Sequence, residues 1–177
     1  PRTYKPEHFI NRELSWLAFN WRVLQMALDV DTPILERLKF LCISSSNLDE
    51  FFEVRVARLM QQARMDAPSM GPDQMTPQQQ LDELNVRTKK FVAEQYRILN
   101  DVILPELEQS DVHFVRRSRW TERQAEWVAD YFKREVLPVL SPIGLDPAHP
   151  FPRIINKSLN FIVSLKGEDA FGRESGI

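Results

Sequence analysis

Histidine is the first side chain to consider as a carrier of chemistry, because it can act as a nucleophile, a proton carrier or a metal ligand. The sequence has 3 histidines, which are His8, His113 and His149. No spacing typical of metal ligands recurs among them. Because the sequence has a single cysteine, Cys42, an internal disulfide and a cysteine-based metal site are excluded. Cys42 lies in an apolar run and is expected to be a small buried residue. The sequence therefore predicts no metal site.

Four arginines gather around a tryptophan in the second half of the chain. They are Arg116, Arg117, Arg119 and Arg123, and they flank Trp120. Guanidinium groups at this density can attract a polyanion, but a solvated surface is the ordinary explanation and the one we favour. The net charge of −2 argues against a nucleic-acid partner, because that kind of binding needs a basic surplus.

Helices are predicted for the first part of the chain, because apolar residues recur there at the helical period. One helix is predicted over 11–28, and it is apolar on nearly all sides, which favours burial against another domain or chain as well as within a bundle. A second helix is predicted to begin at Pro33 and to break at the three serines of 44–46. Asn47 is then expected to cap a third helix, with Glu50 at the spacing of a capping box.

A long helix is predicted to begin at Thr76, which is followed by Gln79 at the capping-box spacing, and Pro105 should end or kink it. Its apolar stripe contains two polar residues, Thr88 and Gln95. Both are expected to be hydrogen-bonded in the interior, as buried polar groups usually are. Antiparallel packing of these helices would form one domain over residues 1–108.

The pattern changes near residue 110, where short apolar runs replace the long helical periods. Strands are predicted at 112–115 and 159–165, with a helix capped by Thr121 between them. Two strands and one helix cannot form a stable sheet domain alone. The predicted fold class is therefore α+β, with a mainly helical N-terminal domain over 1–108 and the start of a truncated α/β domain over 109–177.

Three segments are specific enough to indicate a family. The first two are FINRELSWLAFN at 9–20 and TPILERLKFL at 32–41, the latter continued by SSNLDEFF at 45–52. They resemble the opening of the polyphosphate kinase family that works through a phosphohistidine. The third segment, at 142–152, contains DPAHPFP and is similar to a stretch in the second domain of that family. The resemblance covers nearly the whole chain and is weakest over roughly 66–110.

The resemblance implies a four-domain enzyme that moves the terminal phosphate of ATP reversibly onto polyphosphate, with magnesium. A helical N-terminal domain is followed by an α/β head domain involved in dimerisation. Two catalytic domains then carry the phosphohistidine and most nucleotide contacts. The present chain is expected to be an N-terminal fragment that ends inside the head domain, contains no catalytic residue and is inactive alone. The implied partners are ATP or ADP, polyphosphate, the catalytic domains of the same protein and a second copy bound through the head domain.

One site of the family maps onto this sequence. The asparagine of the SSNLDE segment, which contacts ATP in the family, is Asn47 here. The residues alone favour a helix N-cap, and the two roles do not exclude each other. Asp49 and Glu50 would repel a triphosphate at the expected helix start, whereas an amide can both donate to and accept from an adenine edge. The expectation is therefore a contact with the base and not with the phosphates.

The same resemblance bears on the histidines and the arginines. His149 is not expected to be the nucleophile, because the phosphorylated histidine of the family lies much further along the chain. Polyphosphate becomes the polyanion that Arg116, Arg117 and Arg119 could contact.

A different class of function stays open, namely a non-catalytic helical module that forms dimers through exposed apolar surface.

Sequence features also bear on localisation. No run approaches the roughly 18 apolar residues of a membrane-spanning helix, and no signal peptide is visible. The expected compartment is the cytoplasm, and peripheral attachment to a membrane is left open.

Overall fold

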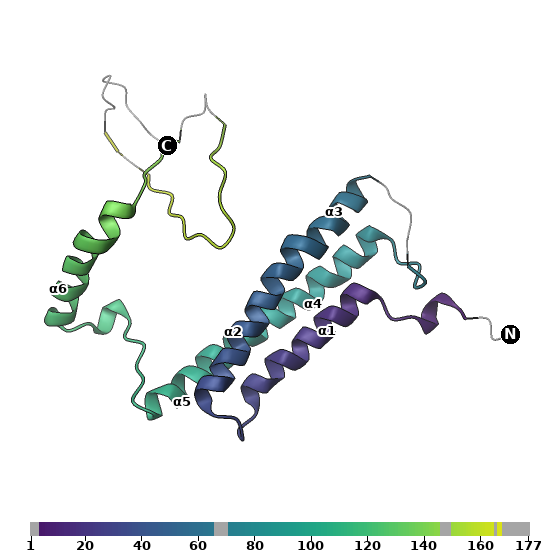
Figure 1. The fold of residues 1–177 in the computed structure, drawn as a ribbon, viewed down its shortest axis with the longest axis horizontal. Coiled ribbons are helices and arrows are strands. Elements are labelled where there is room, and N and C mark those ends of the chain that lie inside the picture. Colours follow the sequence, from purple (N-terminus) through teal and green to yellow (C-terminus); the bar gives the residue numbers. More distant parts are fainter. Residues whose placement is uncertain (1–3, 66–70, 146–149, 165, 168–177) are drawn as a thin grey trace. The chain divides into compact units, whose positions relative to one another are not determined.

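The computed structural model describes residues 4–65, 71–145, 150–164 and 166–167 (Figure 1). All regular structure within these ranges is helical. The α-helices are α1 (Arg12–Gln25), α2 (Ile34–Glu50), α3 (Ala57–Arg64), α4 (Pro77–Arg97), α5 (Leu104–Gln109) and α6 (Glu122–Tyr131). Turns of π-helix occupy Phe51–Val56, Ile98–Ile103 and Phe132–Val136, and 3-10 turns occupy Pro6–His8, Met26–Leu28, Arg117–Arg119 and Leu137–Val139.

The predicted α+β class is wrong for the part of the chain that the structure describes. No strand occurs at 112–115 or over 159–164, and residue 165 lies outside the described residues. A strand is stable only when its backbone N–H and C=O groups pair with a neighbouring strand. The described residues offer neither apolar run such a neighbour, so both remain without regular structure. The partial α/β domain is therefore not seen.

The chain divides into two compact units, Pro1–Arg116 and Arg117–Ile177. The first unit is a bundle of three antiparallel rods (Figure 1). α1 is the first rod, α2 continues through a π turn into α3 as the second, and α4 continues through another π turn into α5 as the third. α1 packs against α2 and α4, and α3 packs against α4.

The bundle has one apolar core to which every rod contributes. Aromatic side chains tie the rods together: the rings of Trp16 and Phe51 stack with centroids 4.4 Å apart, and Trp21 meets Phe91 edge-on at 5.6 Å. Such ring pairs add to the free energy gained by burial. The buried apolar residues are Leu17, Leu24, Ala27, Leu41, Leu48, Phe51, Val56, Leu59, Leu84, Phe91, Ile98, Ile103 and Leu107.

Local sequence signals account for where the bundle helices begin. The side chain of Asn11 accepts hydrogen bonds from the backbone of Glu13 and Leu14, at 3.0 and 3.1 Å, which confirms the predicted N-cap of α1. Thr76 and Gln79 form the predicted capping box of α4. These bonds satisfy backbone N–H groups that have no partner inside the helix.

The third rod ends later than predicted. Pro105 was expected to end or kink it; the helix does not end there but continues to Gln109. A π turn immediately precedes α5, and this wider turn gives the proline ring room beside the preceding carbonyl groups. Two residues beyond the end of the rod, Asp111 has a φ of +60°, and the next N–H, that of Val112, donates to the Leu107 carbonyl at 2.9 Å. This is a left-handed helix cap formed without glycine.

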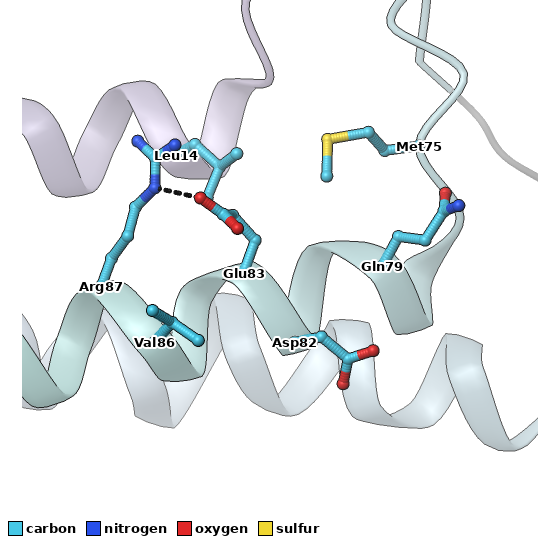
Figure 2. A pocket seen from close by; sticks show the side chains of 7 residues that line it. All are labelled: Leu14, Met75, Gln79, Asp82, Glu83, Val86 and Arg87. Carbon is cyan, nitrogen blue, oxygen red and sulfur yellow. Dashed lines mark hydrogen bonds and ion pairs between the residues drawn. The ribbon is translucent and has the colours of Figure 1, made fainter.

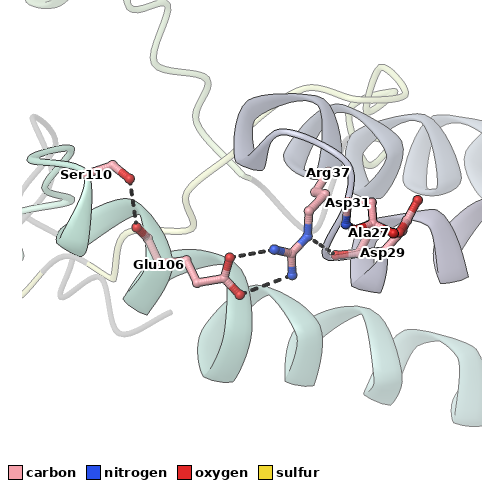
Figure 3. Close-up of polar contacts among 6 residues, drawn as sticks. All are labelled: Ala27, Asp29, Asp31, Arg37, Glu106 and Ser110. Atoms are coloured by element: carbon pink, nitrogen blue, oxygen red, sulfur yellow. Dashed lines mark hydrogen bonds and ion pairs between the residues drawn. The ribbon is translucent and has the colours of Figure 1, made fainter.

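An ion pair between a buried arginine and a half-buried glutamate joins the second rod to the third at the α5 end of the bundle (Figure 3). Arg37 is only 3% exposed. Its guanidinium donates two hydrogen bonds to the Glu106 carboxylate, one of them 3.1 Å long, and its Nε donates to the Ala27 carbonyl at 2.9 Å. A buried guanidinium needs this number of partners to offset the loss of its water.

The second unit contains α6 and has a different character. Thr121 and Gln124 form the predicted capping box. No residue of α6 is buried, and the rings of Trp127 and Tyr131 stack on each other at 5.3 Å while remaining exposed. This helix is therefore specified by local signals, with no apolar core around it among the described residues.

Candidate functional site

The structure places Asn47 inside a helix and not at the start of one. The predicted break at 44–46 does not occur, and α2 runs without interruption from Ile34 to Glu50. The Ser44 hydroxyl donates to the Leu41 carbonyl at 2.7 Å, within its own helix. Packing of the α2 stripe against the other rods overrides the weak helix propensity of the serines. The N-cap role predicted for Asn47 is therefore wrong.

The same helical phase decides the position of Cys42. Buried residues of α2 recur at Arg37, Leu41, Ser44 and Leu48. Cys42 lies off this stripe and is exposed, so the prediction of a buried cysteine is wrong. A residue one position away from a buried one is turned by about 100° around the helix axis.

Asn47 is instead the outer member of a chain of buried polar side chains. Its Nδ2 donates to Oδ1 of Asn20 at 3.1 Å, and the Nδ2 of Asn20 donates to the Ser44 carbonyl at 2.9 Å. The Ser44 hydroxyl in turn accepts from Nε2 of Gln95 at 2.9 Å. α1, α2 and α4 each supply part of this chain, which we call the amide chain: Asn47, Asn20, Ser44 and Gln95.

Burial grades along the amide chain. Asn20 and Ser44 have no exposed surface and Gln95 is 8% exposed, whereas Asn47 is half-buried. Buried polar groups are tolerated in a core when they are hydrogen-bonded to one another. The bond of Gln95 confirms the prediction that this residue is satisfied in the interior. The amide chain thus reaches the surface of the bundle only at Asn47.

The direction of these hydrogen bonds determines how the Asn47 amide is oriented. The Ser44 carbonyl can only accept, so the amide nitrogen of Asn20 must face it and the amide oxygen must face Asn47. The nitrogen of Asn47 must therefore face Asn20. No described residue donates to the remaining oxygen, Oδ1 of Asn47. That oxygen, together with the second N–H of the same amide, is available to a ligand.

The charges next to Asn47 are acidic. Asp49 and Glu50 are exposed in the last turn of α2, and Glu50 follows Asn47 by three residues on the same side of the helix. These carboxylates were predicted at a helix start, and that prediction is wrong. Their charge still disfavours a triphosphate at this position, and an outward amide oxygen cannot accept from ionised phosphate, which has no proton to donate.

Asn20 and Ser44 were missed as members of this site. A signal for Asn20 existed, because it lies three residues after Leu17 and four before Leu24, on the buried stripe of α1. A lone amide on an apolar stripe indicates a buried hydrogen-bonding partner elsewhere. The serine run hid the corresponding signal in α2, because it was interpreted as a helix break.

Two surface depressions of the bundle do not include Asn47. One, of about 630 Å³, is lined by Leu14 of α1, by Met75 and by residues of α4 (Figure 2). Arg87 and Glu83 of α4 form an ion pair there, with 2.7 Å between Nε and Oε1. The other, of about 770 Å³, is an apolar groove between α3 and α4. Thr88 lies along this groove, and its buried hydroxyl has no hydrogen-bond partner, so the prediction that it is satisfied is wrong.

The arginines for which a polyanion contact was the alternative to a solvated surface are all exposed. Arg116 lies at the end of the first unit, while Arg117 and Arg119 lie in a 3-10 turn of the second. His149 lies outside the described residues, as does part of the DPAHPFP segment. Over the ranges that the structure describes, no three His, Cys, Asp or Glu side chains come together in an arrangement that could hold a metal ion.

Comparison with known proteins identifies the family. The model of the polyphosphate kinase N-terminal domain matches residues 9–115, and that of the polyphosphate kinase middle domain matches residues 123–177. These matches cover most of the chain and follow the two units of the structure. The chain belongs to the polyphosphate kinase family.

Relatives of known name and structure agree with this assignment. The chain is 55% identical over 169 residues to "Polyphosphate kinase" of Pseudomonas syringae pv. tomato, a match that covers 96% of this chain and 23% of that protein. It is 54% identical over 166 residues to the protein of that name from Burkholderia multivorans, with 94% and 24% covered. The crystal structure of polyphosphate kinase from Porphyromonas gingivalis superposes with a TM-score of 0.67 at 32% identity, over 92% of this chain and 22% of that one. The chain thus spans about a quarter of the length of these relatives.

Proposed function

We propose that this chain is the N-terminal part of an enzyme that transfers the terminal phosphoryl group of ATP to the end of a polyphosphate chain. The products are ADP and a polyphosphate longer by one phosphate, and the reverse reaction regenerates ATP. The family membership and the names of the relatives support this proposal. The family resemblance implies that the residues that carry out the transfer belong to the part of the relatives that this chain does not cover, so no catalytic residue is assigned here.

The role of the bundle in this proposal is to contact the nucleotide through Asn47. The observation that carries it is the amide of Asn47, which is held by Asn20 with its oxygen left for a ligand. An amide with one fixed side can bond the edge of adenine, which offers a donor beside an acceptor. The neighbouring carboxylates keep the phosphates away, so the contact is with the base.

Magnesium is the metal that the proposed reaction uses with ATP, where it neutralises charge on the phosphates. The described residues do not fit a magnesium site, since no three acidic or other ligating side chains converge. Asp49 and Glu50 stand in sequence next to a proposed base contact, not a phosphate contact. No step through the metal is therefore assigned to this chain.

The nucleotide contact is tested by steady-state kinetics of the complete protein. Asn47→Ala should raise KM for ATP about tenfold and leave kcat nearly unchanged, because a contact with a non-reacting part of the substrate contributes mainly to binding. Ser46→Ala, at the exposed neighbouring position, is the matched control and should change neither constant. An unaltered KM for ATP in the Asn47→Ala protein would contradict the proposed nucleotide contact. The 177-residue chain alone should form no polyphosphate.

A second candidate function is a non-catalytic interaction module that joins copies of the protein. The observation that favours it is the exposed apolar surface of the second unit, where Trp127 is 64% exposed and Phe132 is 44% exposed. Surface of this kind often marks an interaction site. Sedimentation of the chain would show dimers if this function is correct, and Trp127→Ser should dissociate them.

The arginines beside Trp120 are the proposed polyphosphate contact. The exposure of Arg116, Arg117 and Arg119 supports it. Replacing the three by glutamate should weaken polyphosphate binding and flatten its dependence on salt, because fewer counterions are then released. Unchanged binding would exclude the contact.

None of the described helices is long and apolar enough to span a membrane.

A further inference from the structure

We propose that Asn20 is a positioning residue for the nucleotide, which makes the enzyme prefer adenine over 6-oxopurines by fixing the orientation of the Asn47 amide. This inference rests on the proposed contact between Asn47 and the base. Asn20 itself is fully buried in the bundle and has no exposed surface that a ligand could contact. Its effect on the nucleotide therefore acts through Asn47 alone.

The geometry around Asn20 allows only one arrangement of the two amides. Asn20 spans from the Ser44 carbonyl, at 2.9 Å from its Nδ2, to Nδ2 of Asn47, at 3.1 Å from its Oδ1. Turning the Asn20 amide over would place its oxygen against the Ser44 carbonyl, with two acceptors in contact and no water to separate them. A buried polar group without a partner is costly, so the turned arrangement is disfavoured.

The Ser44 backbone carbonyl fixes the direction of these hydrogen bonds because it can only accept. A hydroxyl can both donate and accept, as the Ser44 hydroxyl does when it donates to the Leu41 carbonyl and accepts from Nε2 of Gln95. The carbonyl has no such freedom. The Ser44 carbonyl therefore fixes the orientation of the Asn20 amide, which in turn fixes that of the Asn47 amide. As a result, Oδ1 of Asn47 faces outward.

A fixed outward oxygen discriminates between purines at one ring position. Adenine carries an amine at C6, which can donate to Oδ1 of Asn47. Hypoxanthine and guanine carry an oxygen there, which would face the Asn47 oxygen as a second acceptor. If the Asn47 amide could turn over, its nitrogen would suit that oxygen and the discrimination would disappear. The fixed orientation is thus what gives the site its base preference.

The test compares kcat/KM for ATP and for ITP in the complete protein, with polyphosphate as acceptor. Asn20→Leu should lower the ATP-to-ITP preference about tenfold, the size expected for one hydrogen bond with a fixed partner. Asn20→Asp should keep the preference within about twofold, because its carboxylate still accepts from Asn47 Nδ2. The aspartate is the more destabilising change, since it buries a charge. A purely structural role predicts the opposite order, with the aspartate variant the more impaired.

A control and a coupled variant complete the comparison. Leu24→Ala creates a cavity in the same helix and should lower stability without altering the ATP-to-ITP preference. In an Asn47→Ala background, Asn20→Leu should cause no further change in the preference. Equal preference in the Asn20→Leu and Asn20→Asp proteins, or an additional loss in the double variant, would overturn the inference.

Measurements on the unaltered protein keep the inference testable if Asn20→Leu does not fold. A fixed oxygen predicts that purine riboside triphosphate, which has only hydrogen at C6, is used better than ITP. Use of ITP equal to that of ATP would contradict a fixed orientation. The two proposals fail separately: unchanged KM for ATP in Asn47→Ala removes the nucleotide contact, whereas a raised KM there with a normal preference in Asn20→Leu removes only the role of Asn20.

Discussion

α4 and α6 begin with the same local signal but differ in what surrounds them. Thr76 with Gln79 and Thr121 with Gln124 form matching capping boxes. α4 then buries four residues in the bundle, whereas α6 buries none. The capping box therefore determines where a helix starts, and the surrounding rods determine whether it belongs to a cooperative core.

This contrast explains why the buried amide chain lies in the first unit and not in the second. The amide chain requires three rods that hold Asn20, Ser44 and Gln95 away from water, and only the bundle supplies them. The second unit instead presents apolar and basic side chains outward. Its proposed roles are accordingly in contacts with other chains or with polyphosphate.

The largest expected difference between the two units is in the response to removing an aromatic ring. Phe91→Ala, in the core, should lower the free energy of unfolding by about 3–5 kcal/mol. Trp127→Ala, in α6, should change it by less than about 0.5 kcal/mol because that ring is exposed. Urea denaturation of the 177-residue chain measures both. Similar losses at the two positions would show that the second unit has a core as well.

A buried and an exposed ion pair should differ in the same way within the bundle. Glu106→Gln takes the charged partner from the buried Arg37 and should cost about 1–3 kcal/mol, a value reduced because the glutamate side chain is 39% exposed. Glu83→Gln acts on the exposed pair with Arg87 and should cost at most about 1 kcal/mol. The midpoints of urea unfolding of the two variants measure both costs. Equal costs would mean that the Arg37 pair is not buried in solution.

The two capping boxes offer a more direct comparison. Thr76→Ala should lower the global unfolding free energy by about 1 kcal/mol, because α4 is part of the cooperative core. Thr121→Ala should reduce the hydrogen-exchange protection of α6 and leave global unfolding unchanged. If Thr121→Ala lowers global stability as Thr76→Ala does, then the two units unfold together.

The smallest expected effect comes from an exposed pair on α4. A side-chain hydrogen bond from Arg97 lowers the pKa of Glu94; burial works against this shift, and the charge of Arg97 adds to it. Since the folded pKa lies below the unfolded one, the stabilisation is present above the unfolded pKa and is lost as pH falls through the folded value. Arg97→Gln should move the Glu94 pKa back up, as measured by NMR titration of the carboxyl carbon. An unchanged pKa would contradict the bond.

Three helix starts could be predicted from the sequence because their signals are local, whereas the capping-box spacing of Asn47 and Glu50 predicted a start that does not occur. Asn11, Thr76 and Thr121 each cap a helix with a bond to a residue two or three positions later. Helix ends and breaks were predicted less well. The serines at 44–46 and Pro105 weaken a helix locally, but packing across the bundle continues the helix through both positions.

The site could be predicted only in part, for the same physical reason. The family resemblance pointed to Asn47, and the buried stripe pointed to Gln95. The partners that orient Asn47 lie 27 residues away, at Asn20, and in the backbone of Ser44. No local pattern specifies a hydrogen bond across that separation. The strands predicted at 112–115 and 159–165 do not form over the described residues of these ranges, because a strand depends on a distant partner that its own residues do not encode.

The most direct test of the account is the position of the nucleotide. A crystal structure of the complete protein with a non-hydrolysable ATP analogue should show the C6 amine of adenine within hydrogen-bond distance of Oδ1 of Asn47, with Nδ2 of Asn47 still on Asn20. The phosphates should lie away from Asp49 and Glu50. Phosphates against Asn47, or a base bound out of its reach, would contradict the central claim.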